Sequence, residues 1–467
     1  MTKRTELWPI EGYIDFSSPA GKFAYAPNEM QLYPMISAEP IWGKPLLSGR
    51  QVDLIEPEYA KATISVVRGC NLGCRYCVYG ALPPSEMRLM TSETGRAIID
   101  YLCDAFGNTK RITLSFTSNG EPGLNLNTIE AIKAYCRAKT AEGGYPEFRF
   151  TFATNAIPLS KDTIERYLGE EDQDLFFSVD GPPSLHNLLR ITRSGRGSYD
   201  STISKVAFYR ERYERYGKGF SSSTVLTAQD ENFDEIVLHL DALGFEYIVM
   251  RPIRGATDSE FGLNKTTLPL FQRGYARMLD LIEERALVGD IGLLYKVCNR
   301  YDFFGRLFSA LLLGEERVQG CPGCPPKHSD ISRYSLVFDT DGKVYFPCRD
   351  FIGRGEFFLG SVFSGVNLDH VREVMKRARA TERAVCQACW AHSMCGGSCY
   401  DAALAATGSI EDPDKHLCEL TRYLAERAAK LAHALVVRQP QTAEVLIRRA
   451  ISVSPWARDI GFEEASV

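Results

Sequence analysis

Between residues 62 and 252, short runs of β-branched or aromatic residues alternate with longer stretches of helical periodicity. The six strand-like runs are ATISVV (62–67), RITLSF (111–116), FRFTFA (148–153), DLFFSVD (174–180), SSSTVLT (221–227) and EYIVMRP (246–252). Strands that alternate with helices favour a parallel sheet with right-handed crossovers. Because six units are too few for a closed eight-stranded barrel, we expect an α/β fold built on a partial (β/α)6 parallel barrel.

The most unusual loops follow these expected strands directly. Cys70 comes three residues after the first run, and the stretches TSNGEPG, TNA and DGPPSLHNLLR follow the second, third and fourth runs. In parallel sheets the functional loops lie beyond the carboxyl ends of the strands. We therefore expect these loops to converge on one mouth of the barrel.

Three cysteines stand in the first of these loops, within RGCNLGCRYCVYG (68–80). Cys70, Cys74 and Cys77 have the spacing C-x3-C-x2-C, and neighbouring glycines let the backbone fold around a bulky inorganic group. Soft thiolates select zinc, copper(I) or iron–sulfur clusters. A closed zinc site needs four ligands, whereas three cysteines on a four-iron cluster leave one iron open to an outside ligand. The spacing favours the open cluster, and a zinc site completed by a distant histidine stays as the alternative.

With the aromatic Tyr76 before its last cysteine and a partial barrel behind it, the motif resembles that of the radical S-adenosylmethionine (SAM) enzymes. The resemblance implies that the open iron of a [4Fe-4S] cluster binds SAM and that a 5′-deoxyadenosyl radical is formed, the hard chemistry being the cofactor's. The loop at 118–122 is similar to the family's Gly-Gly-Glu-Pro loop, so Glu121 is expected at the methionine amino group. By the same resemblance, Ser178 and Arg190 are expected at the ribose hydroxyls and the methionine carboxylate, and Tyr76 near the adenine.

A second group of cysteines lies near the carboxyl terminus. The stretch CQACWAHSMCGGSC reads C-x2-C-x5-C-x3-C, and with four further cysteines it provides eight thiols, enough for two four-cysteine sites. This pattern resembles the SPASM extension of radical SAM enzymes that modify peptides, which implies two auxiliary [4Fe-4S] clusters with interleaved ligands. These are Cys321, Cys324, Cys348 and Cys399 for the first, and Cys386, Cys389, Cys395 and Cys418 for the second. A pair of zinc ribbons is the alternative, because C-x2-C pairs are common zinc ligands.

The sequence divides into four parts. We expect a small β-rich extension over residues 1–60, the barrel over 61–300, a cysteine-rich α+β SPASM domain holding iron–sulfur clusters over 301–420, and a helical tail over 421–467. Within the third part, YSLVFDTDGKVYFPC carries a DG pair between two apolar runs and predicts a hairpin. The leftover Cys103 and Cys136 fall in expected helices and are interpreted as buried small apolar side chains.

Composition excludes several classes of partner. The net charge is −5 and 24% of the residues are charged, so no basic excess suggests a nucleic-acid surface. The start lacks the apolar segment of a signal peptide, and the longest apolar stretch is short and interrupted by Arg306. We expect a cytoplasmic protein that does not span a membrane. Fourteen cysteines in a reducing compartment favour metal ligation over disulfides.

The resemblance to the peptide-modifying branch gives the functional hypothesis. We expect an oxidoreductase that matures a peptide or small protein by hydrogen abstraction, installs a thioether crosslink and receives electrons from a flavodoxin or ferredoxin. Family members that form formylglycine carry an aspartate directly after the cysteine corresponding to Cys348; here Arg349 intervenes and Asp350 is the candidate base. The shift favours a thioether over formylglycine, which stays as an alternative together with a carbon–carbon crosslink. The first 60 residues are a candidate for recognising the peptide.

Two further classes remain open. A zinc-stabilised module could bind a partner through its cysteine-rich end, and a radical enzyme of this kind could act on a small sugar or amine. Metal content separates the first from an iron–sulfur enzyme.

Overall fold

A long mixed sheet forms the centre of the structure. The computed structural model describes residues 14–26, 31–34, 59–80, 82–117, 119–255, 257–313, 335–346, 348–367, 369–370, 373 and 383–452. Nine described strands follow one another across the sheet in the order β10-β9-β8-β7-β4-β13-β14-β15-β16. Neighbouring strands from β10 to β13 are parallel, and the strands from β13 to β16 pair in antiparallel fashion.

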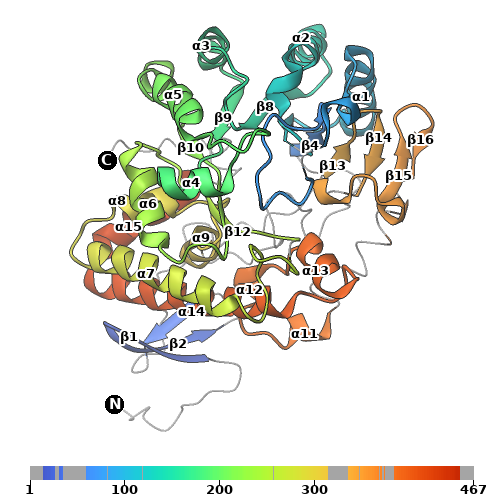
Figure 1. The fold of residues 1–467 in the computed structure, drawn as a ribbon. Helices are drawn as coiled ribbons and strands as arrows, with labels where there is room; N and C mark the ends of the chain where they lie inside the picture. The colour runs from blue at the N-terminus through green and yellow to red at the C-terminus, as the bar shows by residue number, and fades with distance from the viewer. Residues whose placement is uncertain are drawn as a thin grey trace.

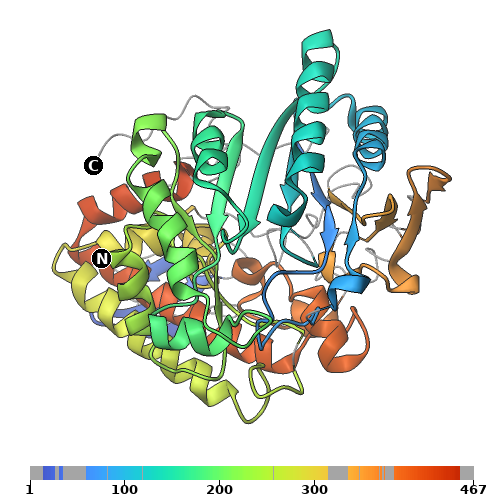
Figure 2. The same cartoon turned by 45° about the horizontal axis from the view of Figure 1, so that its top comes forward.

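The parallel part is the predicted partial barrel, and each predicted strand region contains at least one strand (Figures 1 and 2). The strands are β4 (Tyr59–Ile64), β7 (Arg111–Phe116), β8 (Glu147–Thr154), β9 (Gln173–Phe177), β10 (Ser221–Ser222), β11 (Thr224–Leu226) and β12 (Met250–Pro252). The helices between them are α1 (Ser92–Phe106), α2 (Leu126–Glu142), α3 (Lys161–Gly169), α4 (Pro183–Leu189), α5 (Tyr199–Arg210) and α6 (Phe233–Ala242). The α/β fold with a partial barrel is thus confirmed.

The fifth predicted strand differs from expectation because it is divided at Ser223. The N–H of Ser223 donates to the Phe177 carbonyl, whereas the next N–H, of Thr224, donates to Val249. The N–H of Ser222 also donates to the Tyr247 carbonyl, so the 221–227 run lies between β9 on one side and the segment that leads into β12 on the other. Its two parts are β10, which pairs with β9, and β11, which pairs with β12. The first run also ends early: Val67–Arg68 (β5) leaves the sheet and pairs with Arg88–Leu89 (β6).

The two faces of the barrel strands have different environments. Along β8, apolar side chains are buried at every second position, and the residues between them are only half-buried. The buried face packs under the helices, with Phe116 and Phe150 stacked at 6.2 Å between ring centroids. The opposite face carries polar residues such as Lys61, Thr151 and Asp174. Alternation of this kind is what a strand with one core face requires.

The predicted hairpin is present and joins the barrel sheet. Strands β13 (Ser335–Phe338) and β14 (Lys343–Tyr345) pair in antiparallel register, with Gly342 at φ +78° in the turn. On its other edge β13 pairs parallel with β4, and β15 (Phe358–Ser361) and β16 (Gly365–Val366) extend the sheet outward (Figure 1). The turn of the hairpin, which follows Phe338, therefore lies at the carboxyl end of β4, beside the mouth of the barrel.

Helices cover the open side of the barrel. They are α7 (Leu268–Leu287), α8 (Gly292–Val297), α9 (Gly305–Leu313), α14 (Lys415–Arg438) and α15 (Pro440–Ser452), with the short α11 (Ala384–Gln387), α12 (His392–Cys395) and α13 (Tyr400–Thr407) beside them. A small antiparallel sheet of β1 (Ile14–Ser18), β2 (Gly21–Ala26) and β3 (Gln31–Pro34) packs against α14, where Ser18 Oγ lies 2.6 Å from His433 Nδ1. An early segment of the chain therefore packs against a late one.

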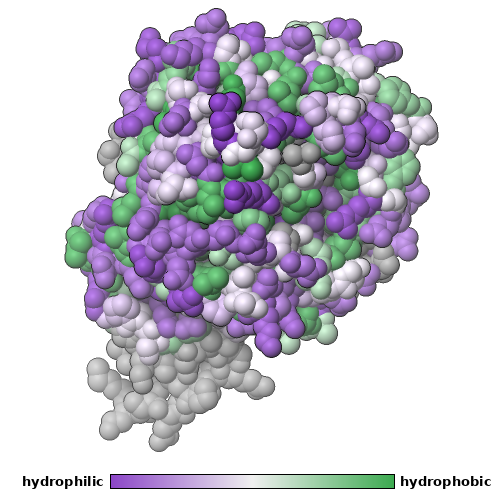
Figure 3. Space-filling model, in the orientation of Figure 1, coloured by the Kyte–Doolittle hydropathy of each residue, from purple (hydrophilic) through white to green (hydrophobic). Residues whose placement is uncertain are grey.

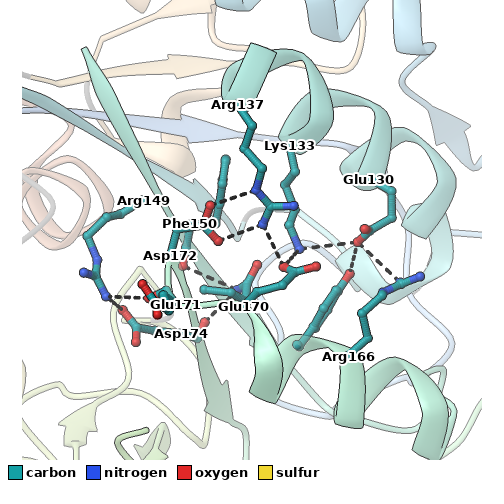
Figure 4. Close-up of polar contacts among 12 residues, drawn as sticks. Glu130, Lys133, Arg137, Arg149, Phe150, Arg166, Glu170, Glu171, Asp172 and Asp174 are labelled. Carbon is teal, nitrogen blue, oxygen red and sulfur yellow. Dashed lines mark hydrogen bonds and ion pairs between the residues drawn. The ribbon is translucent and has the colours of Figure 1, made fainter. Parts of the chain in front are cut away.

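An ion-pair network lies at the amino ends of β8 and β9 (Figure 4). Its centre is Lys133, which is fully buried. The Lys133 Nζ contacts Glu170, lies 3.5 Å from Glu130 Oε1 and sits 4.1 Å from the centroid of the Tyr167 ring. The network joins α2 to α3 on the side of the sheet away from the cysteine loop.

The surface drawn in Figure 3 is mainly polar, with apolar side chains showing across its middle. Within the part of the chain that the structure describes, no helix has both the length and the apolarity needed to cross a membrane.

Candidate functional site

The cysteine loop is held in place by direct backbone contact with the loop that follows β7. The N–H of Gly69 donates to the Asn119 carbonyl at 3.2 Å, and the N–H of Glu121 donates to the Gly69 carbonyl at 3.0 Å. Gly69 and Gly120 form a parallel bridge, and Gly69 adopts φ +128°. The two loops therefore behave as one unit at the carboxyl ends of β4 and β7, as the sequence predicts.

The three thiols of this loop are neighbours. Burial raises the pKa of Cys70 to about 12 and that of Cys74 to about 11, and the charges of the neighbouring cysteines contribute to both shifts. Two donors face the sulfur of Cys70: the N–H of Leu72 at 3.4 Å and the side-chain amide of Asn155 at 3.8 Å. A buried thiolate of this kind needs positive charge to stay ionised, which the irons of a cluster supply. The donor set therefore fits an iron–sulfur cluster.

An ion pair lies directly behind Cys74. The Nε of Arg190 is 2.7 Å from Asp180 Oδ2, and both side chains are almost completely buried. The same carboxylate oxygen accepts from the Tyr76 hydroxyl at 2.7 Å, and Oδ1 accepts from the Val225 N–H at 3.0 Å. The Arg190 guanidinium is 4.0 Å from Cys74 Sγ and 5.8 Å from the Tyr76 ring centroid. The structure thus brings together the two predicted residues Tyr76 and Arg190 through an aspartate.

Glu121 is buried and accepts three hydrogen bonds from the protein. Its Oε1 accepts from Thr154 Oγ1 at 2.6 Å and from the Gly123 N–H at 3.0 Å, and its Oε2 accepts from the Asn155 N–H at 2.8 Å. Burial raises the pKa of Glu121, and these three donors oppose the shift. The carboxylate therefore ties the loop after β7 to the end of β8. Beside it, Asn119 Oδ1 is buried and has no hydrogen-bond partner.

Strain occurs next to this contact. Ala156 has φ +66° and is the one non-glycine residue with positive φ in the described part of the chain. Strained backbone persists only where its surroundings fix it, and it concentrates at functional sites. The hydrogen bonds of Thr154 and Asn155 to Glu121 supply that fixation.

Ser178 lies just beyond the next barrel strand, β9, and His186 lies on the following helix, α4. Ser178 follows β9, its N–H donates to the Thr154 carbonyl at 2.9 Å, and its side chain is half-buried. His186 is fully buried: its Nδ1 accepts from the Asp180 N–H at 3.4 Å and its Nε2 lies 3.1 Å from Ser198 Oγ. Burial and then the nearby Arg190 lower the pKa of His186 to about 4, so the ring is neutral near pH 7. Through its hydrogen bond with the Asp180 N–H, His186 helps to hold the loop that carries Asp180 in place.

Four cysteines of the carboxyl-terminal region lie together. Burial raises the pKa of Cys418 to about 12, and the charges of Cys395, Cys386 and Cys389 contribute, so all four are within electrostatic range. Cys386 and Cys389 lie on α11 and just after it, Cys395 ends α12, and Cys418 lies in the first turn of α14. These are the four residues expected to hold the second auxiliary cluster.

The other expected set is described in part. Cys321 and Cys324 lie outside the described residues, whereas Cys348 and Cys399 are described. The thiol of Cys348 donates to Asp350 Oδ2 at 3.4 Å, and the Tyr79 hydroxyl donates to Oδ1 of the same carboxylate. Burial, and then the charge of Asp401, raise the pKa of Asp350 to about 8. The Cys399 thiol lies 3.7 Å from the guanidinium of Arg254, which follows β12.

Several residues of this site have weak signals in the sequence. Asp180, Asn155 and Tyr79 lie in stretches that the sequence marks as functional loops, but the sequence gives these three residues no individual role, and Arg254 belongs to no motif that we identified. Their position just beyond a strand or a cysteine motif is the signal that could have found them. Among the described residues, no group of three or more His, Cys, Asp or Glu side chains is close enough together to hold a single metal ion. A four-iron cluster spaces its thiolates more widely than one ion does, so the cysteine sets are assigned from their spacing in the sequence and their mutual electrostatic influence.

Comparisons with known proteins agree with this architecture. Residues 64–243 match the model of the radical SAM superfamily. A Clostridium perfringens (strain 13 / Type A) cysteine-type anaerobic sulfatase-maturating enzyme is 24% identical over 363 residues, which cover 75% of this chain and 90% of that protein. An uncharacterized protein of Methanocaldococcus jannaschii is 28% identical over 186 residues, which cover 40% of this chain and 59% of that protein.

Two solved structures share the fold. Native anSMEcpe with bound AdoMet superposes with a TM-score of 0.62 at 18% identity, over 83% of this chain and 99% of that chain. Streptococcus suis SuiB bound to precursor peptide SuiA superposes with a TM-score of 0.51 at 17% identity, over 77% of this chain and 76% of that chain.

Proposed function

Since residues 64–243 belong to the radical SAM superfamily, we propose that the chain is a radical SAM maturase that modifies a peptide or protein. One observation carries the proposal: the Cys70 loop is bonded to the loop that contains Gly120, and both lie at the carboxyl ends of the barrel strands beside the buried Arg190–Asp180 pair. Thiols, a fixed backbone and a buried cation at one mouth are the elements needed to hold a cluster and a charged cofactor.

In this proposal Cys70, Cys74 and Cys77 bind a [4Fe-4S] cluster with one open iron. When bound, the cluster supplies the electron that cleaves SAM into methionine and a 5′-deoxyadenosyl radical. Arg190 binds the methionine carboxylate, and Asp180 holds both its guanidinium and the Tyr76 hydroxyl in position. Tyr76 contacts the adenine and Ser178 the ribose.

The role of Glu121 follows from its contacts. Its carboxylate accepts three hydrogen bonds from the protein, so we assign it to fixing the loop after β7. The methionine amino group, for which Glu121 was expected, would then meet this loop through its backbone. Glu121 acts as a positioning residue in this scheme.

The two carboxyl-terminal cysteine sets are proposed to bind auxiliary [4Fe-4S] clusters. Cys386, Cys389, Cys395 and Cys418 are close enough for their charges to interact, which supports the second set. The first set comprises Cys321, Cys324, Cys348 and Cys399. The electrons enter from an external donor of flavodoxin or ferredoxin type.

The step on the substrate is an oxidation. With the cofactor and clusters bound, the site would remove one hydrogen atom from a peptide carbon and take up one electron from the resulting radical, and a base of the protein would accept one proton. Asp350 is the proposed base, because its buried carboxylate lies between Tyr79 and Cys348 at the mouth of the barrel. If a cysteine thiol of the substrate attacks the oxidised carbon, the product is a thioether with two hydrogen atoms fewer than the peptide.

A second product is favoured by the comparisons. The relative from Clostridium perfringens is named a cysteine-type anaerobic sulfatase-maturating enzyme. Formylglycine formation from a cysteine begins with the same loss of a hydrogen atom, an electron and a proton, and water then releases the sulfur as hydrogen sulfide. A carbon–carbon crosslink is the remaining alternative.

The first experiment measures metal content and SAM cleavage. Anaerobically reconstituted protein should hold about twelve irons per chain, with equal sulfide, and should release 5′-deoxyadenosine when reduced by dithionite in the presence of SAM. The Cys70→Ala/Cys74→Ala/Cys77→Ala variant should retain about eight irons and release none. Zinc in place of iron, with no cleavage, would identify a zinc-stabilised binding module and overturn the proposal.

The product is tested with a mixture of synthetic cysteine-containing peptides. A thioether removes the thiol without forming an aldehyde and preserves the sulfur, whereas formylglycine is captured by a hydrazide. Mass spectrometry after thiol alkylation and hydrazide treatment separates the two. Release of 5′-deoxyadenosine with no change in any peptide, followed by conversion of a sugar or amine, would assign a small-molecule substrate instead.

A further inference from the structure

Arg254 links the barrel to the carboxyl-terminal cysteines. It is the second residue after β12. Ile253, which stands between them, donates its N–H to the Leu226 carbonyl at 2.9 Å. Its Nη1 lies 3.7 Å from the sulfur of Cys399, a residue 145 positions later in the chain. A side chain from the mouth of the barrel therefore meets a cysteine of the first auxiliary set.

The segment around Arg254 is docked closely on α13. Gly255 has φ +71°, and an ideal Cβ there would lie 2.6 Å from Asp401 Oδ2. Two residues further on, Thr257 Oγ1 donates to the Ala405 carbonyl at 3.4 Å, and the side-chain amide of Asn264 donates to the Thr257 carbonyl at 3.0 Å. These contacts fix the backbone on both sides of the guanidinium, so its position near Cys399 is set by the fold.

The charge at this place has an electrochemical consequence. A four-iron cluster with four thiolates gains one negative charge on reduction, and a fixed cation close to a ligand stabilises the reduced form more than the oxidised form. Net charge and hydrogen bonds to sulfur are among the factors that set the reduction potentials of such clusters. Arginine keeps its charge at any working pH, so the effect does not depend on protonation.

We propose that Arg254 raises the reduction potential of the first auxiliary cluster and so makes that cluster the acceptor of the electron lost by the substrate radical. The inference rests on the proposed function, because it requires that Cys399 binds a cluster. One electron leaves the substrate carbon and enters the cluster, and one proton leaves the substrate for the base. Arg254 is a positioning residue for this step, since it acts through the cluster and not on the substrate.

Arg254 and Arg383, which lies near the second auxiliary set, come from different segments of the chain. Burial raises the pKa of Cys386 and the nearby Arg383 opposes that rise, but Arg383 stands only three positions earlier in the same segment. Arg254 belongs to the barrel, whose mouth also carries the Cys70 loop. It therefore couples the auxiliary cluster to the element where hydrogen abstraction takes place.

The test is an anaerobic redox titration followed by electron paramagnetic resonance. The parent protein carries Cys70→Ala, Cys74→Ala and Cys77→Ala, so that only auxiliary clusters contribute signals. Arg254→Gln and Arg254→Met remove the charge and Arg254→Lys keeps it. Arg277→Gln removes an arginine that is 48% exposed and paired with Asp234, and it serves as the matched control.

We expect both neutral variants to shift one auxiliary midpoint to more negative potential, by about 59 mV for a tenfold change in the one-electron equilibrium. The lysine variant and the Arg277→Gln control should keep the parent midpoint. Unchanged midpoints in Arg254→Gln and Arg254→Met overturn the inference, and so does an equal shift in Arg254→Lys, since the charge would not be the cause. Iron and sulfide analysis distinguishes a failure of the proposed function from a failure of the role of Arg254. A parent protein without auxiliary iron overturns the proposed function itself. A parent protein with about eight irons, but with midpoints that do not move in the neutral variants, overturns only the role of Arg254.

Discussion

An ideal Cβ placed on Gly120 would lie 2.1 Å from the carbonyl oxygen of Gly69. No side chain can be accommodated at that separation, because the obstructing atom belongs to the backbone of the cysteine loop. The hydrogen bonds of Asn119 and Glu121 to Gly69 hold the two loops at this distance. The position of the three thiols therefore depends on the absence of a side chain 50 residues away in the sequence.

Replacing Gly120 by alanine should push the cysteine loop away from its neighbour. We expect the variant to lose more than half of the iron of the first cluster and most of its SAM cleavage, while the auxiliary iron stays bound. The unfolding free energy should fall by about 1–3 kcal/mol, as for other overpacked sites. Iron analysis and thermal unfolding of the reconstituted protein measure both effects.

Gly355→Ala provides the control for Gly120→Ala. An ideal Cβ at Gly355 meets nothing within 4 Å, and its φ is not positive. This variant should match the wild-type protein in iron content and stability. Full iron and normal SAM cleavage in Gly120→Ala would contradict the rigid coupling of the two loops.

Asp180 should be more important than its place in a turn suggests. Asp180→Ala removes the partner of the buried Arg190 and leaves an unpaired cation, which typically costs about 3–5 kcal/mol. SAM binding, measured by equilibrium dialysis, should weaken at least tenfold because Arg190 and Tyr76 lose their common anchor. The exposed pair of Arg137 and Asp172 is the comparison: Asp172→Ala should change stability by about 0–1 kcal/mol and leave SAM binding unchanged. Equal SAM affinity in Asp180→Ala and wild type would refute the anchoring role.

The sequence alone was sufficient to predict which segments form strands, but not every neighbour of each strand. RITLSF became β7 with the predicted bounds, because a run of β-branched and aromatic residues is a local property of the chain. The parallel pairing of β13 with β4 and the division of the 221–227 run at Ser223 were missed. Both depend on contacts between distant segments, to which local periodicity is insensitive.

The candidate site shows the same contrast between local patterns, which the sequence reveals, and contacts between distant segments, which it does not. The cysteines are recognisable because metal ligation constrains both residue type and spacing. In the structure, Cys386, Cys389 and Cys395 all lie near enough to Cys418 to influence its pKa. Asp180, Asn155 and Arg254 act through single contacts made across the fold, and aspartate, asparagine and arginine are common in loops for other reasons. Glu121 was found by its motif, which predicts a contact with the cofactor, whereas its hydrogen bonds from Thr154 and Asn155 depend on the fold and were not predicted.

Lys133 should contribute to stability without affecting chemistry. Its ammonium group is fully buried between Glu130, Glu170 and the Tyr167 ring, at the amino ends of the strands and thus away from the cysteine loop (Figure 4). Lys133→Ala leaves a cavity and removes a partner of Glu170, so we expect the unfolding free energy to fall by about 3 kcal/mol. Chemical denaturation measures this, and the iron content and SAM cleavage of the folded fraction should be unchanged. A loss of SAM cleavage at normal stability would contradict the separation of the two regions.

His186 predicts a stability loss in acid. Its pKa is lowered from 6.5 to about 4 in the folded chain, because the ring is buried and lies near the Arg190 cation. The unfolded chain takes up a proton on this ring below pH 6.5, whereas the folded chain does not until about pH 4. The folded state therefore loses up to about 3 kcal/mol as the pH falls through this window, and loses nothing further below it. His186→Gln should unfold at lower denaturant concentration near pH 7 but show a shallower decline between these pH values than wild type or His370→Gln, a partly exposed control. Parallel pH profiles for all three proteins would exclude His186 as the cause.

Cys418 should be required for the second auxiliary cluster although it lies 23 residues beyond Cys395. It is in the first turn of α14, where it reaches the electrostatic neighbourhood of Cys386, Cys389 and Cys395. Cys418→Ala should lower the iron content by about four atoms per chain and leave the SAM-cleaving cluster in place. Cys103→Ala is the matched control, since Cys103 is buried in α1 within the apolar core and should cost stability but no iron. If Cys418→Ala retained all its iron, Cys418 would not be a ligand and the interleaved assignment of the two cysteine sets would have to be revised.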